Sequence, residues 1–209
     1  MAEVGVFEAI HTLLQITRYK PDPVPQEAIE KVIEAATMAP SGGNIQEWEF
    51  IVITDRHLVG QVARVYREIW LEEHGEELRE GEPPVYKRAR HLAKHMHEVP
   101  VLILMCADHQ RGYWGHTQGD PIVRGIYAHS IWPAAQNLFL AARGLGLGTR
   151  ITTNHMPREQ EIKELLGIPD YVETVALIPM GYPQGKFVTP KRRPAAEVTS
   201  YNRYGNRKV

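Results

Sequence analysis

The chain has 209 residues, of which 43% are hydrophobic and 23% charged, with a formal net charge of −1 at pH 7. This length fits one domain with a substantial core, and the balanced charge excludes the strongly basic surface that nucleic acids and anionic membranes attract. The single cysteine, Cys106, excludes an intramolecular disulfide, and without a signal-peptide pattern or a long apolar stretch we expect a cytoplasmic protein with no nucleic-acid or membrane partner.

The first quarter of the chain predicts two helices followed by a strand. A short helix is expected over 5–15, and the proline-rich segment 18–25 cannot be helical. The second helix begins near Gln26 and ends before Pro40, because apolar residues recur at helical spacing up to that proline. Residues 50–53 are nearly all apolar, which predicts a strand covered on both faces.

The middle of the chain predicts a pair of helices and a central strand. An amphipathic helix over 57–78 passes into a charged loop over 75–84, and a second helix is expected over 85–97. The apolar run 100–107 predicts a buried strand. A loop containing glycine and histidine follows over 108–121.

The last third begins with the longest predicted helix, over 122–143. Pro133 lies inside it, so the helix is expected either to kink there or to begin there. Strands are predicted over 148–153 and 172–180, with a helix over 157–166 between them. The remaining residues are rich in proline and basic side chains, which predicts an extended arm.

One polar stretch, over 39–48, lies between the second helix and the first strand. It places Gly42 and Gly43 among Ser41, Asn44 and Gln46. Glycines let the backbone approach a flat or charged ligand closely, and the three polar side chains supply hydrogen-bond donors and acceptors. Taken alone, the stretch favours an ordinary connecting turn.

Three other patterns do not support a site. The glycine runs at 144–148 and 181–187 each lack residues that a nucleotide-binding motif needs. His91, His95 and His97 invite a zinc interpretation because residues four apart share a helix face. No second ligand pair with matching spacing is present, so a solvated histidine cluster is favoured and no metal site is predicted.

Six stretches, in the right order along the chain, resemble the FMN-dependent nitroreductase family. They cover residues 18–25, 39–48, 91–103, 133–149, 179–183 and 190–194. The resemblance implies an α+β fold, a three-layer α/β/α nitroreductase-like sandwich built by a single domain over 1–209. It also implies an intertwined homodimer with FMN at the interface, in which the C-terminal arm, 184–209, crosses to the other subunit.

The flavin-binding residues that the resemblance implies are Arg18, Ser41, Asn44, Gln46, Lys94, Gly148, Thr149, Arg150, Ile151, Lys191 and Arg193. The three polar residues of the 41–46 stretch would approach the flavin of the partner subunit. Lys94 would stabilise the negative charge of the reduced ring at its N1 and O2 edge, and the 148–151 segment would run past the ring. Lys191 and Arg193 would hold the 5′-phosphate.

The chain departs from the family pattern in two places. The family usually carries Arg-Arg-Ser-x-Arg before an Arg-Phe/Tyr pair, and here that segment reads LLQIT, residues 13–17. Basic contacts to the phosphate are therefore missing, and Arg18 or Arg150 would have to replace them. Glu47 stands where the family has proline between Gln and Trp, and it adds negative charge close to the expected site.

The resemblance implies an FMN-dependent oxidoreductase. NADPH or NADH would pass hydride to flavin N5 and leave, and an electron-poor acceptor such as a nitroaromatic or a quinone would then take its place in a ping-pong mechanism. No catalytic side chain is required. The alternative is a non-catalytic flavin-binding or scaffold dimer with weakened FMN affinity, and a third interpretation is a metal-dependent hydrolase using the histidines.

Two segments, 66–90 and 108–120, are expected to cover the flavin site, and the first is expected to act as a lid. The aromatic residues in or near these segments are either stacking surfaces for a ligand or ordinary core residues. They are Tyr66, Trp70, Tyr86, Tyr113 and Trp114.

Overall fold

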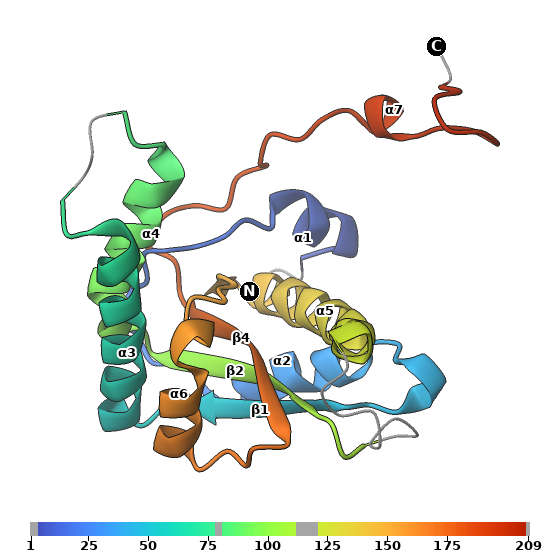
Figure 1. Ribbon diagram of the computed structural model, residues 1–209. Helices are drawn as coiled ribbons and strands as arrows, with labels where there is room; N and C mark the ends of the chain where they lie inside the picture. The colour runs from blue at the N-terminus through green and yellow to red at the C-terminus, as the bar shows by residue number, and fades with distance from the viewer. Residues whose placement is uncertain (1–3, 78–80, 112–120, 208–209) are drawn as a thin grey trace.

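The computed structural model describes residues 4–77, 81–111 and 121–207, with the backbone alone for 121–129. Its centre is a four-stranded antiparallel sheet in the order β1-β2-β4-β3 (Figure 1). The strands are β1 (Trp48–Ile53), β2 (Val101–Asp108), β3 (Gly148–Thr149) and β4 (Val172–Gly181). The two central strands, β2 and β4, are apolar on both faces, as expected for strands covered by helices on both sides.

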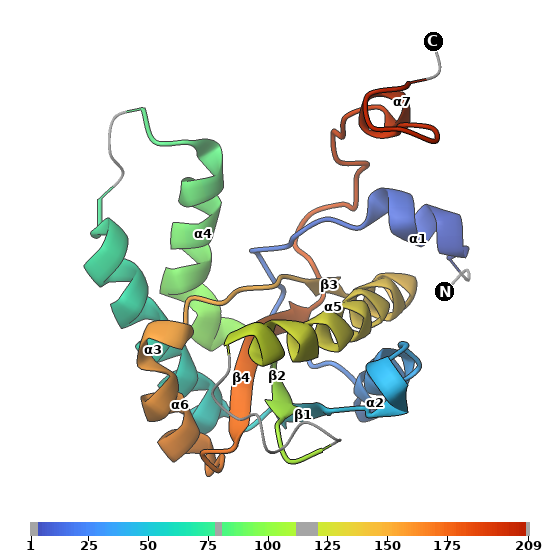
Figure 2. The same cartoon turned by 45° about the vertical axis from the view of Figure 1, so that its right-hand side comes forward.

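Alternation along β2 divides the core in two. The even-numbered residues from Leu102 to Cys106 pack against one set of helices, and the odd-numbered residues from Val101 to Ala107 pack against another. This follows from the strand period of two, which sends successive side chains to opposite faces. The sheet is therefore the middle of three layers, and the predicted α/β/α sandwich is confirmed (Figures 1 and 2).

The helices of the first layer are α3 (Arg56–His74), α4 (Pro84–His95) and α6 (Glu159–Leu166). The second layer contains α2 (Gln26–Thr37) and α5 (Pro121–Gly144). Short 3-10 turns are η1 (Gly42–Asn44), η2 (Met96–Glu98) and η4 (Met156–Arg158). Within the described residues, no helix combines the length and the apolar character that crossing a membrane requires.

Capping residues explain where two of the helices begin or end. Asp55 caps α3 by accepting a 2.9 Å hydrogen bond from the Leu58 amide. Gly167 ends α6 in the left-handed conformation that glycine adopts without steric cost. Helix α5 continues through Pro133, so the idea that it begins there is wrong.

The sequence misplaced two boundaries near the N-terminal segment. Helix α1 (Val6–Thr12) ends before residue 15, because the chain from Leu13 onward is extended and reaches the sheet. The predicted strand over 148–153 is regular only at β3, with Thr152 adding an isolated bridge to Leu177. Both errors arise from pairing between distant segments, which local periodicity does not report.

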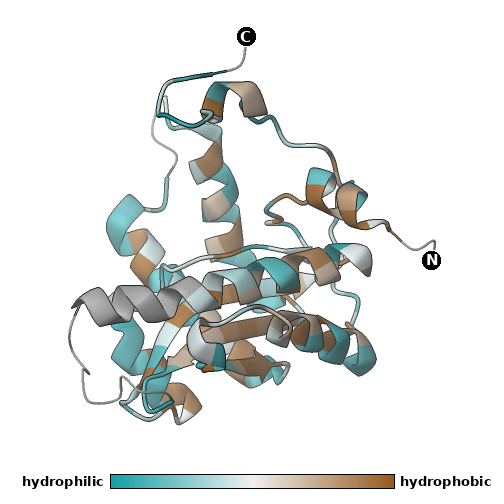
Figure 3. Cartoon of the chain, turned by 90° about the vertical axis from the view of Figure 1, so that its right-hand side faces the viewer, coloured by the Kyte–Doolittle hydropathy of each residue, from teal (hydrophilic) through white to brown (hydrophobic). Residues whose placement is uncertain are grey.

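The two ends of the chain stand off from the body. Beyond the sheet, residues 182–207 are largely extended apart from α7 (Ala195–Val198), and they rise away from the sheet (Figure 1). Helix α1 exposes 74% of Phe7 and also exposes Val6 and Ile10. Apolar residues of α1 and α7 are visible as brown segments on these two projections (Figure 3).

Arg143, near the end of α5, anchors both projections to the body. Its guanidinium lies over the Phe187 ring at the start of the arm, 4.1 Å from the centre of that ring. It donates a 2.9 Å hydrogen bond from Nε to Thr12 Oγ1 and pairs with Glu8 at 3.4 Å. The arm beyond Phe187 has exposed side chains at nearly every position.

Candidate functional site

The N-terminal segment after α1 pairs with β3. The Ile16 amide donates to the Thr149 carbonyl at 2.9 Å, and Gln15 forms a parallel bridge with Thr149. The Gln15 side chain accepts a 2.7 Å hydrogen bond from the Ile151 amide. The structure therefore brings the predicted residues of 148–151 next to the segment that leads to Arg18.

Gly148 allows this close approach. A Cβ built at Gly148 would lie 2.5 Å from Ile16 Cγ1 and 3.0 Å from Ile16 Cβ. Contacts this short are sterically excluded, so the pairing of the two segments requires glycine at 148.

Thr149 and Arg150 present buried polar atoms that have no hydrogen-bond partner among the described residues. Both Thr149 Oγ1 and Arg150 Nε are in this state, although the Arg150 amide bonds to Pro179. Buried polar groups are normally hydrogen-bonded, and each exception calls for an explanation. Each of these atoms is therefore a candidate for contact with a bound polar group.

The 41–46 turn has an unusual backbone. Gly43, Asn44 and Gln46 all have φ between 54° and 60°. Residues other than glycine rarely occupy this left-handed region. The turn binds itself: the Gln46 amide donates to Ser41 Oγ at 3.1 Å, and Gln46 Nε2 donates to Asn44 Oδ1 at 3.1 Å. Strained, exposed polar turns of this kind cluster at functional sites.

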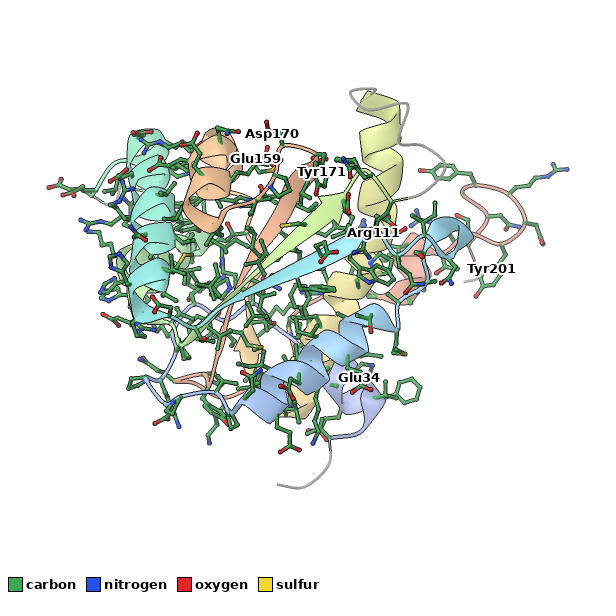
Figure 4. All side chains as sticks on the ribbon, turned by 90° about the horizontal axis from the view of Figure 1, so that it is seen from below. Glu34, Arg111, Glu159, Asp170, Tyr171 and Tyr201 are labelled. Carbon is green, nitrogen blue, oxygen red and sulfur yellow. The ribbon has the colours of Figure 1, made fainter. Side chains whose placement is uncertain are left out.

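Two residues that the sequence did not single out support this turn. Ser130 on α5 accepts a 3.4 Å hydrogen bond from the Gly42 amide. Arg111 donates to the Gln46 carbonyl at 3.5 Å and pairs with Glu49 on β1. Figure 4 shows Arg111 beside the end of the sheet near this turn. Neither residue lies in a recognisable motif, so only the fold reveals them.

The turn and β3 lie at opposite ends of the sheet. Trp48, just after the turn, pairs with Ala107, whereas Thr149 pairs with Met180, which in turn pairs with Val101. Val101 and Ala107 are six residues apart along β2, a separation of roughly 20 Å at the usual rise of a strand. One chain therefore does not bring the two groups of predicted residues together.

The remaining predicted residues are all cations on the surface. Arg18 is exposed in the N-terminal segment, two residues after Ile16, and Lys94 is exposed on α4. Lys191 and Arg193 are exposed, and the arm that carries them runs away from the body of the same chain (Figures 1 and 2).

For two of the aromatic residues, the structure decides between a stacking surface and a core residue in favour of the core. Tyr66 and Trp70 are 1% and 3% exposed and belong to the core beneath α3, so neither offers a face to a ligand. Tyr86 is 37% exposed and its ring lies 6.2 Å from that of Trp70. Tyr113 and Trp114 lie outside the described residues.

A comparison with protein-family models decides the family. The model described as the nitroreductase family matches residues 16–182, which is most of the chain. The chain belongs to the nitroreductase family.

Individual proteins agree with this assignment. Among relatives in sequence, the NADH dehydrogenase of Thermus thermophilus is 26% identical over 212 residues, covering 88% of this chain and 89% of its own length. Among solved structures, a BluB-like flavoprotein from Clostridium difficile 630 has a TM-score of 0.73 at 26% identity, covering 95% of this chain and 99% of the other. Oxidised iodotyrosine deiodinase bound to FMN and 3-iodo-L-tyrosine has a TM-score of 0.76 at 24% identity, with 96% and 100% covered.

In this nitroreductase-family chain, the departures from the family segment have structural consequences. Leu13 and Leu14 pack against the two hydrophobic clusters, and the Gln15 side-chain oxygen is occupied by the Ile151 amide. These three positions hold the N-terminal segment in place. Glu47, the other departure, is only 2% exposed and lies between the turn and β1.

The same nitroreductase-family chain carries a buried polar group beneath α6. His155 is fully buried, with Nε2 3.1 Å from Thr174 Oγ1, and Thr174 donates to Glu159 Oε1 through both its amide and its hydroxyl. Figure 4 shows Glu159 on α6 above the sheet. Burial lowers the pKa of His155 to about 4.

This pKa predicts a loss of stability in mild acid. The unfolded chain takes up the His155 proton near pH 6.5 and the folded chain only near pH 4, so the unfolded state binds more protons between these values and stability falls as pH decreases. The expected contribution is about 3 kcal/mol. Urea unfolding from pH 7 to pH 4 should show a shallower decline for His155→Gln than for the wild type, and the exposed-residue control His57→Gln should match the wild type. Equal slopes for all three proteins would contradict this assignment.

Proposed function

We propose that this chain is a flavin-dependent oxidoreductase that binds FMN between two copies of itself. One observation carries the proposal: the strained polar turn at 41–46 and the unpartnered polar atoms at Thr149 and Arg150 lie at opposite ends of the sheet. A site built from both groups therefore needs two chains. Membership of the nitroreductase family and the flavoprotein likeness support FMN as its ligand.

Helix α5 gives a route to such a dimer. Its 24 residues span about 36 Å, with Ser130 near the 41–46 turn and Gly144 leading into β3. The face of α5 turned away from the core exposes Trp132 and Gln136. If two copies pack around a two-fold axis at this face, each turn approaches the partner's β3. The exposed apolar surfaces of α1 and the arm would be covered in the same assembly.

The residues at β3 fit a flavin. Thr149 Oγ1 and Arg150 Nε are buried polar atoms that a ligand could satisfy, and the polar turn supplies further donors and acceptors. When bound, FMN would accept hydride from NADPH or NADH and pass it to an electron-poor acceptor, such as a nitroaromatic or a quinone, in a two-step exchange. Lys94 would supply positive charge to the ring edge. Ser41, Asn44 and Gln46 of the second chain would orient the ring.

A mixed-dimer experiment tests the two-chain site. One variant carries Ser41→Ala, Asn44→Ala and Gln46→Ala, and the other carries Thr149→Ala and Arg150→Ala. Each variant alone should lose flavin and NADPH oxidation with a nitroaromatic acceptor. Dimers that contain one copy of each, isolated with two affinity tags, have one site with both lesions and one with none, so they should regain about half of the wild-type activity.

As a control, each variant is produced alone with the same two affinity tags, so that the isolated dimers contain only that variant. These dimers should stay inactive. If the site belonged to one chain, every site in the mixed dimer would carry a lesion and activity would not return. That result would contradict the proposal.

The second candidate function is a flavin-binding dimer without turnover. The observation that favours it is the loss of basic residues at 13–15, where Leu13, Leu14 and Gln15 serve packing and backbone pairing. The visible spectrum of the purified protein separates the two functions. A yellow protein bleached by NADPH or NADH supports the oxidoreductase, and a yellow protein that neither reductant bleaches supports the binding protein.

A further inference from the structure

A cavity of about 210 Å³ lies between α4 and the N-terminal segment. Its lining residues come from three segments that are distant in sequence. They are Thr17, Arg18, Tyr19, His91, His95, Glu98, Val99 and Gln184. Among these residues, only Arg18 belongs to the flavin-binding residues that the family resemblance implies.

Arg18, two histidines and one carboxylate line this cavity. The imidazoles of His91 and His95 are stacked with their centres 4.3 Å apart. The pKa of His91 is lowered by partial burial and then by Arg18 and His95, while Glu98 acts in the opposite direction. Glu98 is the acidic residue of the lining, and it already pairs with His95 Nδ1 at 3.0 Å and with His97 at 3.7 Å.

The backbone around the cavity is fixed by hydrogen bonds. The Gln184 amide donates to the Arg18 carbonyl at 3.1 Å, and Gln184 Nε2 donates to the Tyr19 carbonyl at 2.8 Å. The Lys20 amide donates to the Tyr182 carbonyl at 2.8 Å. The start of the arm therefore fixes the backbone of the segment that carries Arg18.

The lining suits an anion better than a metal ion. Within the described ranges, no three histidine, cysteine, aspartate or glutamate side chains are grouped so that they could hold a metal. A guanidinium beside the imidazoles would repel a cation, and it matches the paired oxygens of a phosphate or carboxylate. The volume exceeds the roughly 30 Å³ that one water occupies, which leaves room for a phosphate group with ordered water.

We propose that this cavity is a phosphate site, in which Arg18, His91 and His95 bind the phosphate of a nucleotide cofactor. The site supplies positive charge that the chain lacks at Leu13, Leu14 and Gln15. The ligand's identity rests on the proposed function, because a flavin oxidoreductase uses two phosphate-bearing molecules, FMN and NADPH. The binding of phosphate itself does not depend on that function.

Titration with inorganic phosphate, followed by NMR of the histidine side chains, tests the site directly. Saturating phosphate should raise the pKa of His91, because a bound anion favours the protonated ring. Arg18→Gln should weaken phosphate binding about tenfold or more, as expected for the loss of a charge-assisted hydrogen bond. Arg88→Gln removes the same charge from an exposed position on α4 outside the lining and should have little effect.

Two outcomes would overturn the site. One is a His91 pKa that phosphate does not change, and the other is an equal loss of binding in Arg18→Gln and Arg88→Gln. His91→Gln provides a second variant if Arg18→Gln does not fold, and it should also weaken phosphate binding about tenfold.

Paired ligands identify the source of the phosphate. If FMN occupies the cavity, Arg18→Gln should weaken FMN and leave riboflavin unchanged. If NADPH occupies it through its additional phosphate, the variant should raise the KM for NADPH and leave that for NADH unchanged. If Arg18→Gln affects FMN and riboflavin equally, and also affects NADPH and NADH equally, the assignment to a cofactor phosphate is overturned. Wild-type protein that binds neither flavin, yet whose His91 responds to phosphate, would refute the proposed function and leave this site standing.

Discussion

Replacing Lys191 and Arg193 together with alanine is expected to lower the affinity for FMN by about 100-fold or more, with little change in the affinity for riboflavin. Each residue would contribute a charge-assisted contact to the 5′-phosphate, worth about 1.5–3 kcal/mol. Both side chains are exposed on the arm and lie outside the core, so the fold should survive the substitution. Quenching of flavin fluorescence measures the two affinities.

Arg192→Ala is the matched control, because Arg192 lies between the two residues and its side chain bonds to the Lys191 carbonyl. It should bind FMN much as the wild type does. Unchanged FMN affinity in the double variant would contradict the role of the arm. Together with a loss of FMN binding in Arg18→Gln, that result would place the phosphate in the cavity beside α4.

Gly148→Ala is expected to destabilise the fold by about 1–3 kcal/mol and to reduce the flavin content of the purified protein. The added methyl would meet Ile16 Cγ1 at 2.5 Å and Ile16 Cβ at 3.0 Å. Because the backbone fixes the Cβ position, the N-terminal segment would have to move away from β3. That movement would disturb Thr149, and it would break the contact between Gln15 and Ile151. Urea unfolding measures the stability, and absorbance measures the flavin.

The double variant Gly148→Ala with Ile16→Ala checks the cause. Removing the Ile16 branches relieves the 2.5 Å contact, so the double variant should be less destabilised than the sum of its two single variants. Strict additivity would show that the two residues do not clash, and the account of Gly148 would then fail.

The sequence predicted the layers of the fold because each layer leaves a local pattern. The apolar run of β2 indicated a strand covered on both faces, and the helical spacing of α2 and α3 placed their buried sides. Proline fixes φ and lacks a backbone N–H. These two properties predicted the non-helical segment after Arg18 and the end of the helix before Pro40. Resemblance to a family then supplied the three-layer order, which local patterns do not determine.

What the sequence did not reveal depends on contacts between distant segments. Gln15 was counted as a lost phosphate contact, yet its side chain holds the Ile151 amide, 136 residues away. The sequence left Tyr66 and Trp70 open between stacking surfaces and core residues, and the structure places both in the core. The separation of the 41–46 turn from β3 follows from strand register, which is set by pairing across the sheet. The same limit applies to the cavity beside Arg18, because its lining comes from three separate stretches of sequence.

The anchoring of the arm and α1 at Arg143 has a thermodynamic consequence. Both projections expose apolar side chains, including Phe7, Val188 and Val198, that a single chain leaves in water. If a second copy covers them, part of the free energy of unfolding comes from association and follows mass action. The stability of this fold is then a function of protein concentration, and dilution alone weakens it.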